Sequence, residues 1–253
     1  MGWSERQQAM LAEMGIRLWQ PPPTEPAPIE PGRSSPSPAA REDSAAPAAA
    51  APVNRDRAVG VEAMGWDALR EAVAACRACK LCEGRRQTVF GVGHTSAHWM
   101  IVGEAPGEQE DRQGEPFVGK SGQLLDAMLR AIGLTRAPAD AARQVYIANT
   151  LKCRPPGNRN PEPEELAQCE PFLIRQVELV KPRIILAMGR FAVQSLLRSH
   201  EPIGKLRGRV HRYRGVPLIV TYHPAYLLRN LEDKAKAWDD LCLAVETLEA
   251  GTA

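Results

Sequence analysis

The chain has 253 residues, of which 44% are hydrophobic and 25% charged, which is enough for one sizeable α/β core with an appendage. Its 32 Lys and Arg residues almost balance 30 Asp and Glu residues, so any nucleic-acid contact has to come from local basic patches. No run reaches the roughly 18 apolar residues of a membrane span, and Glu5, Arg6 and Glu13 interrupt the apolar core that a signal peptide needs. We therefore expect a cytoplasmic protein that does not enter a membrane.

The N-terminal part differs in composition from the rest. Residues 1–20 carry a short apolar pattern typical of an amphipathic helix, whereas residues 21–60 are rich in Pro, Ala and Ser. Such a linker buries too little apolar surface to offset the entropy of ordering it, so we expect it to be disordered. The 1–20 peptide is either a frayed or self-docking tail or a binding segment for a partner protein. The folded domain is expected over residues 61–253.

That domain alternates helical and strand patterns. It opens with a helical pattern around Trp66, Leu69 and Val73. Four short apolar runs follow, each typical of a buried parallel strand: Trp99–Val102, Val145–Leu151, Arg183–Met188 and Pro217–Tyr222. The helical patterns between and after them cover Leu124–Ile132 behind a Ser121 cap, Leu166–Leu179, Phe191–Leu197 and Trp238–Leu248. The alternation predicts a doubly wound, three-layer α/β/α domain.

Four cysteines are spaced as metal ligands. Cys76 and Cys79 form a C-x-x-C pair, Cys153 closes the second predicted strand, and Cys169 lies beyond a Pro-rich loop. Together they can complete a four-thiolate site, which suits zinc and an iron-sulfur cluster equally well. In a reducing compartment this clustering favours metal binding over disulfides.

The other two cysteines have a simpler interpretation. Cys82 continues the spacing of a bacterial ferredoxin run, but Arg86 stands where the fourth cysteine of that run would be. Cys82 and Cys242 are therefore interpreted as small buried residues.

Two Gly/Pro-rich loops directly follow predicted strands. They are Gly103-Glu104-Ala105-Pro106-Gly107 and His223-Pro224-Ala225-Tyr226-Leu227-Leu228-Arg229-Asn230. Because the carboxyl ends of parallel strands meet at one edge of a sheet, we expect the two loops to share a cleft. Gly103 and Gly107 allow a sharp turn that brings backbone N–H groups close to a ligand.

Taken together, the motifs resemble the iron-sulfur (family 4) uracil-DNA glycosylases, over roughly Cys76 to Leu231. The resemblance rests on the two loops, on Pro116-Phe117-Val118-Gly119-Lys120, and on Asn149 ahead of Lys152-Cys153-Arg154-Pro155-Pro156. It implies a four-stranded parallel sheet and hydrolysis of the N-glycosidic bond of deoxyuridine in DNA, the first step of base excision repair. The partner it implies is uracil-containing DNA, single- or double-stranded, bound by a monomer.

The resemblance also implies a cofactor. By matching position, Cys76, Cys79, Cys153 and Cys169 would hold a 4Fe-4S cluster, with zinc as the alternative, and Cys82 falls where relatives need no cysteine. Hydrolysis moves no electrons, so the cluster is expected to pin segments that flank the DNA.

The residues of the base pocket can be given roles within this resemblance. Phe117 is expected to stack on the flipped base, with a place in the core as the alternative. Asn149 can accept the uracil N3–H and donate to O4, a pattern that cytosine reverses; it could otherwise cap its own strand. His223 is expected to donate to the developing charge on the base as a neutral imidazole.

One loop departs from the best-known members of that superfamily. They carry an Asp at the position of Ala105 to orient the attacking water, which Ala105 cannot do. Glu104 and Asp111 are therefore the candidate water-orienting residues, while the backbone from Glu104 to Gly107 could supply further donors or position the base.

DNA contacts are expected from the second loop and from the basic run ahead of it. Leu227 or Leu228 could fill the gap left by the flipped base, or be core, and Arg229 is placed for a phosphate. The run from Lys205 to Arg214, which includes Arg207 and Arg209, alternates as in an exposed strand and either binds phosphates or is a solvated edge. Leu231 stands where relatives usually have Pro.

Two other functions remain open at this point. A protein that captures uracil in DNA without turnover is one, but some close relatives do so with a His in the loop after the third cysteine, and residues Arg154 to Asn160 contain no His. A redox-sensing iron-sulfur protein is the other.

Overall fold

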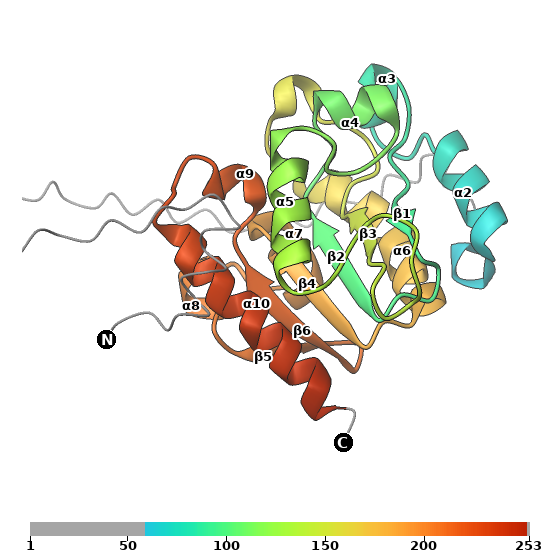
Figure 1. Cartoon of the computed structure of the whole chain (residues 1–253). Coiled ribbons are helices and arrows are strands. Elements are labelled where there is room, and N and C mark those ends of the chain that lie inside the picture. Colours follow the sequence, from blue (N-terminus) through green and yellow to red (C-terminus); the bar gives the residue numbers. More distant parts are fainter. Residues whose placement is uncertain (1–58, 252–253) are drawn as a thin grey trace, which may run out of the picture.

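The computed structural model describes residues 59–251, so the predictions for residues 1–58 concern a part of the chain outside the described residues. A six-stranded sheet lies between two layers of helices, which confirms the predicted α/β/α class (Figure 1). The strands are β1 (Val92–Gly93), β2 (Trp99–Gly103), β3 (Tyr146–Asn149), β4 (Ile184–Met188), β5 (Val210–Tyr213) and β6 (Val216–Thr221). The longer helices are α2 (Trp66–Ala75), α5 (Lys120–Ala131), α6 (Pro163–Val180), α7 (Arg190–Leu197) and α10 (Asp233–Ala250). Short helical turns complete the chain: η1 (Val61–Ala63), α3 (Leu81–Gly84), α4 (Glu108–Gln113), η2 (Pro156–Asn158), α8 (Ile203–Leu206) and α9 (Pro224–Leu227).

The sheet has two more strands than the four expected. Its order is β1-β3-β2-β4-β6-β5, and the inner four strands are parallel. The two edges, β1 and β5, pair antiparallel with their neighbours. β1 has two residues, too few for an apolar pattern, while β5 is the alternating basic segment, exposed on one face as an edge strand requires.

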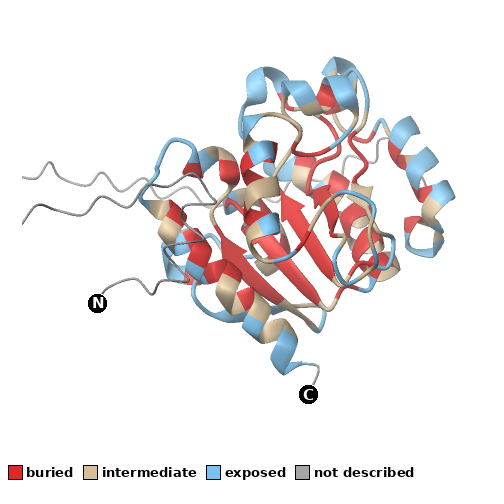
Figure 2. Cartoon of the chain, viewed as in Figure 1, coloured by how far each residue is buried: buried red, intermediate tan, exposed pale blue. Residues whose placement is uncertain are grey.

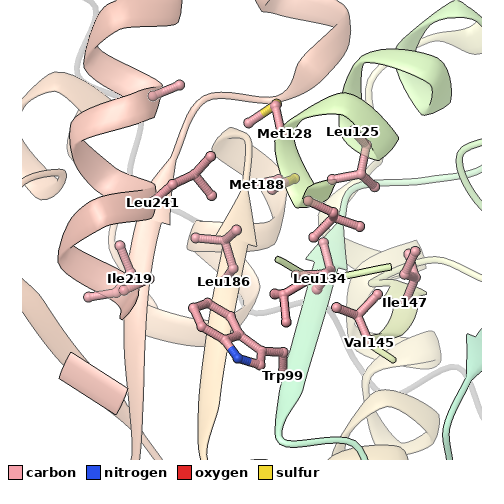
Figure 3. Packing of buried hydrophobic residues seen from close by; sticks show 14 of the residues in the cluster. Trp99, Leu125, Met128, Leu134, Val145, Ile147, Leu186, Met188, Ile219 and Leu241 are labelled. Atoms are coloured by element: carbon pink, nitrogen blue, oxygen red, sulfur yellow. The ribbon is translucent and has the colours of Figure 1, made fainter. Parts of the chain in front are cut away.

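The core has two halves because side chains alternate across the sheet. Ile101, Ile147, Leu186 and Ile219 are neighbours in register and pack against α5 and α10. Figure 3 shows Ile147, Leu186 and Ile219 in this packing. The next residues along the strands, such as Val102 and Val220, pack against α6 and α7 on the other face. Both faces of the inner strands are therefore buried (Figure 2).

The start of α5 differs from the prediction. Gly119 is the N-cap, and Ser121 lies inside the first turn instead of capping the helix. Gly122 explains the close approach of this turn, because a Cβ at Gly122 would collide with the backbone carbonyl of Phe117. The helix is thereby seated directly on the segment that carries Phe117.

The topology gathers the ends of the parallel strands at one edge. Gly103 pairs with Asn149 across β2 and β3, and Met188 pairs with Thr221 across β4 and β6. The loops after β2, β3 and β6 consequently leave the sheet on the same side. Within residues 59–251, no helix is both long and apolar enough to cross a membrane.

Candidate base-binding pocket

A cavity of about 420 Å³ lies at this edge of the sheet, a size typical of small-ligand sites. The residues predicted to bind the base all line it: Glu104, Ala105, Gly107, Phe117, Asn149 and His223. The two Gly/Pro-rich loops thus share one cleft, as predicted. Asn158 and Arg159 also reach the cavity from the loop after β3, although no motif in the sequence marked them.

The amide of Asn149 is buried and incompletely bonded. Only 2% of the residue is exposed, and its Oδ1 atom has no hydrogen-bond partner within the described residues. A Cβ at Gly103, its partner in register, would collide with this oxygen and with the Phe117 ring. Buried polar atoms are almost always bonded, so an unpartnered acceptor that lines a cavity suits a ligand with an N–H group.

Phe117 combines the two roles that the sequence left open. Its ring belongs to the buried core cluster and also lines the cavity. The ring stacks on the imidazole of His223, with the centroids 5.2 Å apart and an interplanar angle of 26°. Its backbone has a φ of 55°, a region that costs a bulky residue energy and that recurs at active sites and ligand clamps.

His223 has a defined tautomer in this structure. The N–H of Ala225 donates to His223 Nδ1 over 3.1 Å, so the proton of the neutral ring lies on Nε2. Burial, together with the nearby Arg229 cation, lowers the pKa of His223 to about 4. The ring is therefore a neutral donor at physiological pH.

Glu104 is an acidic residue that lines the cavity and whose pKa is shifted. Burial raises its pKa to about 7, and the Arg190 cation at the start of α7 opposes this shift. The Glu104 carbonyl accepts hydrogen bonds from the Leu151 N–H and from Thr150 Oγ1, at 3.1 and 2.5 Å. These bonds fix the loop to the end of β3, so the carboxyl group is held beside the base pocket.

The backbone of the first loop has fewer available donors than expected. The Gly107 N–H donates to Glu110 Oε2 at 3.0 Å, and the Val118 N–H donates to the other oxygen of the same carboxylate at 3.1 Å. Glu110 thus ties the loop after β2 to the segment that carries Phe117. The Gly107 N–H is engaged in the fold and is not directed to a ligand.

Asp111 does not belong to the pocket, which corrects its role as a water-orienting candidate. The residue is 2% exposed, and both of its carboxylate oxygens accept from the Arg86 N–H, at 3.0 and 3.1 Å. Asp111 therefore anchors the segment after Cys82 to α4, and Glu104 remains as the candidate.

The predicted DNA-binding residues divide into buried and exposed ones. Leu227 is fully buried in the core cluster and cannot be a wedge, because it forms the inner face of α9. Leu228 is 40% exposed, and Arg229 is exposed and close enough to His223 to act on its charge.

The basic run divides in the same way. Arg207 bonds both oxygens of the buried Asp240, at 3.1 and 3.0 Å, and therefore holds the segment after α8 to α10 instead of facing DNA. The side chain of Arg209 is 57% exposed, and within residues 59–251 its one ion pair is a long contact of 3.9 Å to Glu201.

The cysteines gather in a second cavity. All four predicted ligands line it, and Cys82 does so as well, which corrects its interpretation as a simple core residue. Arg85 Nη1 donates to Cys153 Sγ at 2.9 Å, and the Lys152 N–H donates to Cys169 Sγ at 3.3 Å.

Some of the thiols in this cavity have raised pKa values, and the described thiols are not arranged around a single metal ion. Burial raises the pKa of Cys79 to about 11 and that of Cys169 to about 12. Within residues 59–251, no three His, Cys, Asp or Glu side chains are positioned to hold one metal ion. The cavity thus offers a set of soft donors from three separate segments of the chain.

Known proteins are similar to this chain across the base pocket. Residues 90–242 match the Uracil DNA glycosylase superfamily. The Type-4 uracil-DNA glycosylase of Archaeoglobus fulgidus is 43% identical over 170 residues, covering 64% of this chain and 82% of the relative. The Type-4 enzyme of Thermotoga maritima is 41% identical over 172 residues, covering 67% and 86%. The Type-4 enzyme of Pyrobaculum aerophilum is 39% identical over 188 residues, covering 71% and 93%.

Proposed function

Because the chain belongs to the uracil DNA glycosylase superfamily, we propose that it hydrolyses the N-glycosidic bond of deoxyuridine in DNA, releasing uracil and leaving an abasic site. The observation that carries this proposal is the buried, unpartnered Oδ1 of Asn149, which lines the same cavity as Phe117 and His223. DNA that contains uracil is the substrate, and one copy of the chain is proposed to act on it.

Base selection follows from the amide of Asn149. A uracil flipped into the cavity would present its N3–H to Oδ1, whereas cytosine has an acceptor at that position and would leave the oxygen unbonded. An unpaired buried acceptor costs about 1–3 kcal/mol, so the pocket selects against cytosine. The aromatic wall of Phe117 recovers part of the few kcal/mol that unstacking the base costs.

Bond cleavage places negative charge on the departing uracil. The C1′–N1 electron pair leaves with the base, and the Nε2–H of His223 donates to the anion that forms. The lowered pKa keeps the ring neutral, so it donates a hydrogen bond without first losing a proton to solvent.

Water completes the reaction at C1′ of the sugar. Its oxygen forms the new bond to carbon, and its proton passes to a base, for which we assign the carboxylate of Glu104. A pKa of about 7 lets this group be ionised in a large fraction of molecules at neutral pH and still accept a proton.

We also propose a 4Fe-4S cluster, held by the thiolates of Cys76, Cys79, Cys153 and Cys169. A single zinc ion is the less favoured alternative, because no three donor side chains of residues 59–251 are positioned around one ion. The convergence of these donors on one cavity supports it, as do the N–H groups directed at two of the sulfurs. When bound, the cluster would cross-link segments beside the base pocket. Visible absorption at about 400 nm together with iron analysis would identify it, while zinc would leave the protein colourless.

A uracil-release assay tests the proposed activity. Oligonucleotides with one deoxyuridine, single- and double-stranded, are incubated with a small amount of protein, and free uracil is measured by mass spectrometry. Many turnovers per protein are expected, with none on the matched cytosine substrate or with His223→Ala. Retention of the protein on DNA without free uracil would instead indicate a binding protein.

A further inference from the structure

Lys152 is a fully buried lysine between the base pocket and the cysteine cavity. Its Nζ donates to the backbone carbonyl of Asn149 at 2.8 Å and to Gln176 Oε1 at 2.6 Å. Gln176 is itself held, because its Nε2 donates to the Phe90 carbonyl at 2.8 Å and to the Tyr146 hydroxyl at 3.1 Å. The ammonium group therefore has two fixed acceptors, and both are neutral.

The charge on Lys152 lacks an acidic partner in the described part of the chain. No carboxylate there lies within ion-pair distance of Nζ, and Lys152 lines the same cavity as the sulfurs of Cys153 and Cys169. A buried charge without a counter-ion is strongly unfavourable. A thiolate set in the adjoining cavity would supply the missing negative charge.

The cavity itself is bordered by cations. Lys152 lines it, and the Lys152 backbone N–H donates to Cys169 Sγ. Arg85 also lines it and donates to Cys153 Sγ. Two positive side chains at one small cavity favour a net negative occupant, which four thiolates around a metal centre provide.

We propose that Lys152 is a positioning residue that couples the thiolate site to base recognition: its ammonium is the counter-ion of the ligated thiolates and also holds the backbone of Asn149, whose amide selects uracil. The coupling runs through five consecutive residues, with Asn149 at one end and the ligand Cys153 at the other. The hydrogen bond from Lys152 Nζ to the Asn149 carbonyl links two positions of this segment that are three residues apart and so restrains its conformation. This inference deepens the proposed function and rests on it.

The test compares Lys152→Met, which fills the space without charge or donors, with Lys181→Met, an exposed lysine at the end of α6. Two quantities are measured in the purified, metal-loaded protein: the rate of metal loss to a chelator, and kcat and KM for uracil release. For Lys152→Met we expect metal loss about 10-fold faster or more, and kcat about 10–100-fold lower with little change in KM. Values within about twofold of Lys181→Met in both measurements would overturn the proposal.

A second variant keeps the test decisive if Lys152→Met does not fold. Gln176→Leu leaves the charge in place but removes one of its two acceptors, so kcat should fall while metal retention stays near that of the wild type. An unchanged kcat in folded Gln176→Leu would overturn the positioning role. If the wild type binds zinc instead of a cluster, the metal lost to the chelator is zinc and not iron, so a wrong cofactor assignment is distinguished from a wrong role for Lys152.

Discussion

Gly103 and Asn149 face each other in register across β2 and β3, and the space of the absent Gly103 side chain is taken by the Asn149 amide and the Phe117 ring. A glycine is therefore required by the approach of two pocket side chains, and not by a turn. The strand end, the base-reading amide and the aromatic wall form one packed unit, so a change at Gly103 acts on all three.

Gly103→Ala should consequently reduce activity strongly. The added methyl group displaces both Asn149 and Phe117, and a shift of about 1 Å in a positioning group can cost about 100-fold in rate. Overpacking should also lower the free energy of unfolding by about 1–3 kcal/mol. Steady-state kcat/KM and urea unfolding measure the two effects. Gly84→Ala is the matched control, because a Cβ there meets no atom within 4 Å, and equal activity of the two variants would contradict the argument.

Asn149→Leu should separate function from stability. Leu has a similar volume and removes the unpartnered Oδ1, so unfolding should require about 1 kcal/mol more free energy, while uracil release should fall by at least about 100-fold. Thermal melting and kcat/KM check the two directions. A variant that is both inactive and clearly less stable would show that the amide has a structural partner and is not held open for a ligand.

Much of the fold and of the pocket could be predicted because those features are local in the sequence. Buried parallel strands are short continuous apolar runs, and the pocket residues Asn149 and His223 stand at or just beyond strand ends, which the topology then gathers at one edge. Each pair of cysteines is local in the same sense: Cys76 and Cys79 form a C-x-x-C pair, and Cys153 and Cys169 flank the Pro-rich loop. The two pairs lie far apart in the sequence, so their convergence on one cavity was inferred from the chemistry of four thiols and not from local spacing.

The errors concern side chains whose orientation is set by a distant partner. Asp111 is turned inward by the Arg86 N–H, 25 residues away, and Arg207 by Asp240, 33 residues away. Leu227 faces inward because α9 packs on α5, a contact that its loop sequence does not encode. Lys152 was part of a recognised motif, but its two acceptors could be seen only after the chain was folded.

The pH dependence of uracil release should follow Glu104. Burial raises its pKa to about 7, and only the ionised form accepts a proton, so kcat/KM should rise with pH up to about 7 and then level off. His223 has a pKa of about 4 and is therefore neutral near pH 7, so its titration adds no second transition to the pH profile of kcat/KM. Glu104→Gln should abolish the rise and lower the plateau by about 100-fold or more.

The matched control for that experiment is Glu71→Gln, an exposed residue of α2. It should keep the wild-type profile of kcat/KM between about pH 5 and pH 9, a range that includes the expected rise below about pH 7. If Glu104→Gln retained the rise near pH 7, another group would have to accept the proton from water.

Arg207 and Arg209 lie two residues apart, but their substitution by alanine should affect different properties of the protein. Arg207→Ala leaves the buried Asp240 without its partner, so the free energy of unfolding should fall by about 3 kcal/mol while the salt dependence of DNA binding stays unchanged. Arg209→Ala should leave stability unchanged and lower the slope of log K against log salt concentration by about 1, because an exposed arginine that contacts a phosphate releases about one counter-ion. Urea unfolding and binding titrations at several salt concentrations measure both. A lower salt slope for Arg207→Ala would place that guanidinium on the DNA despite its bond to Asp240, and an unchanged slope for Arg209→Ala would make β5 a solvated edge with no part in DNA binding.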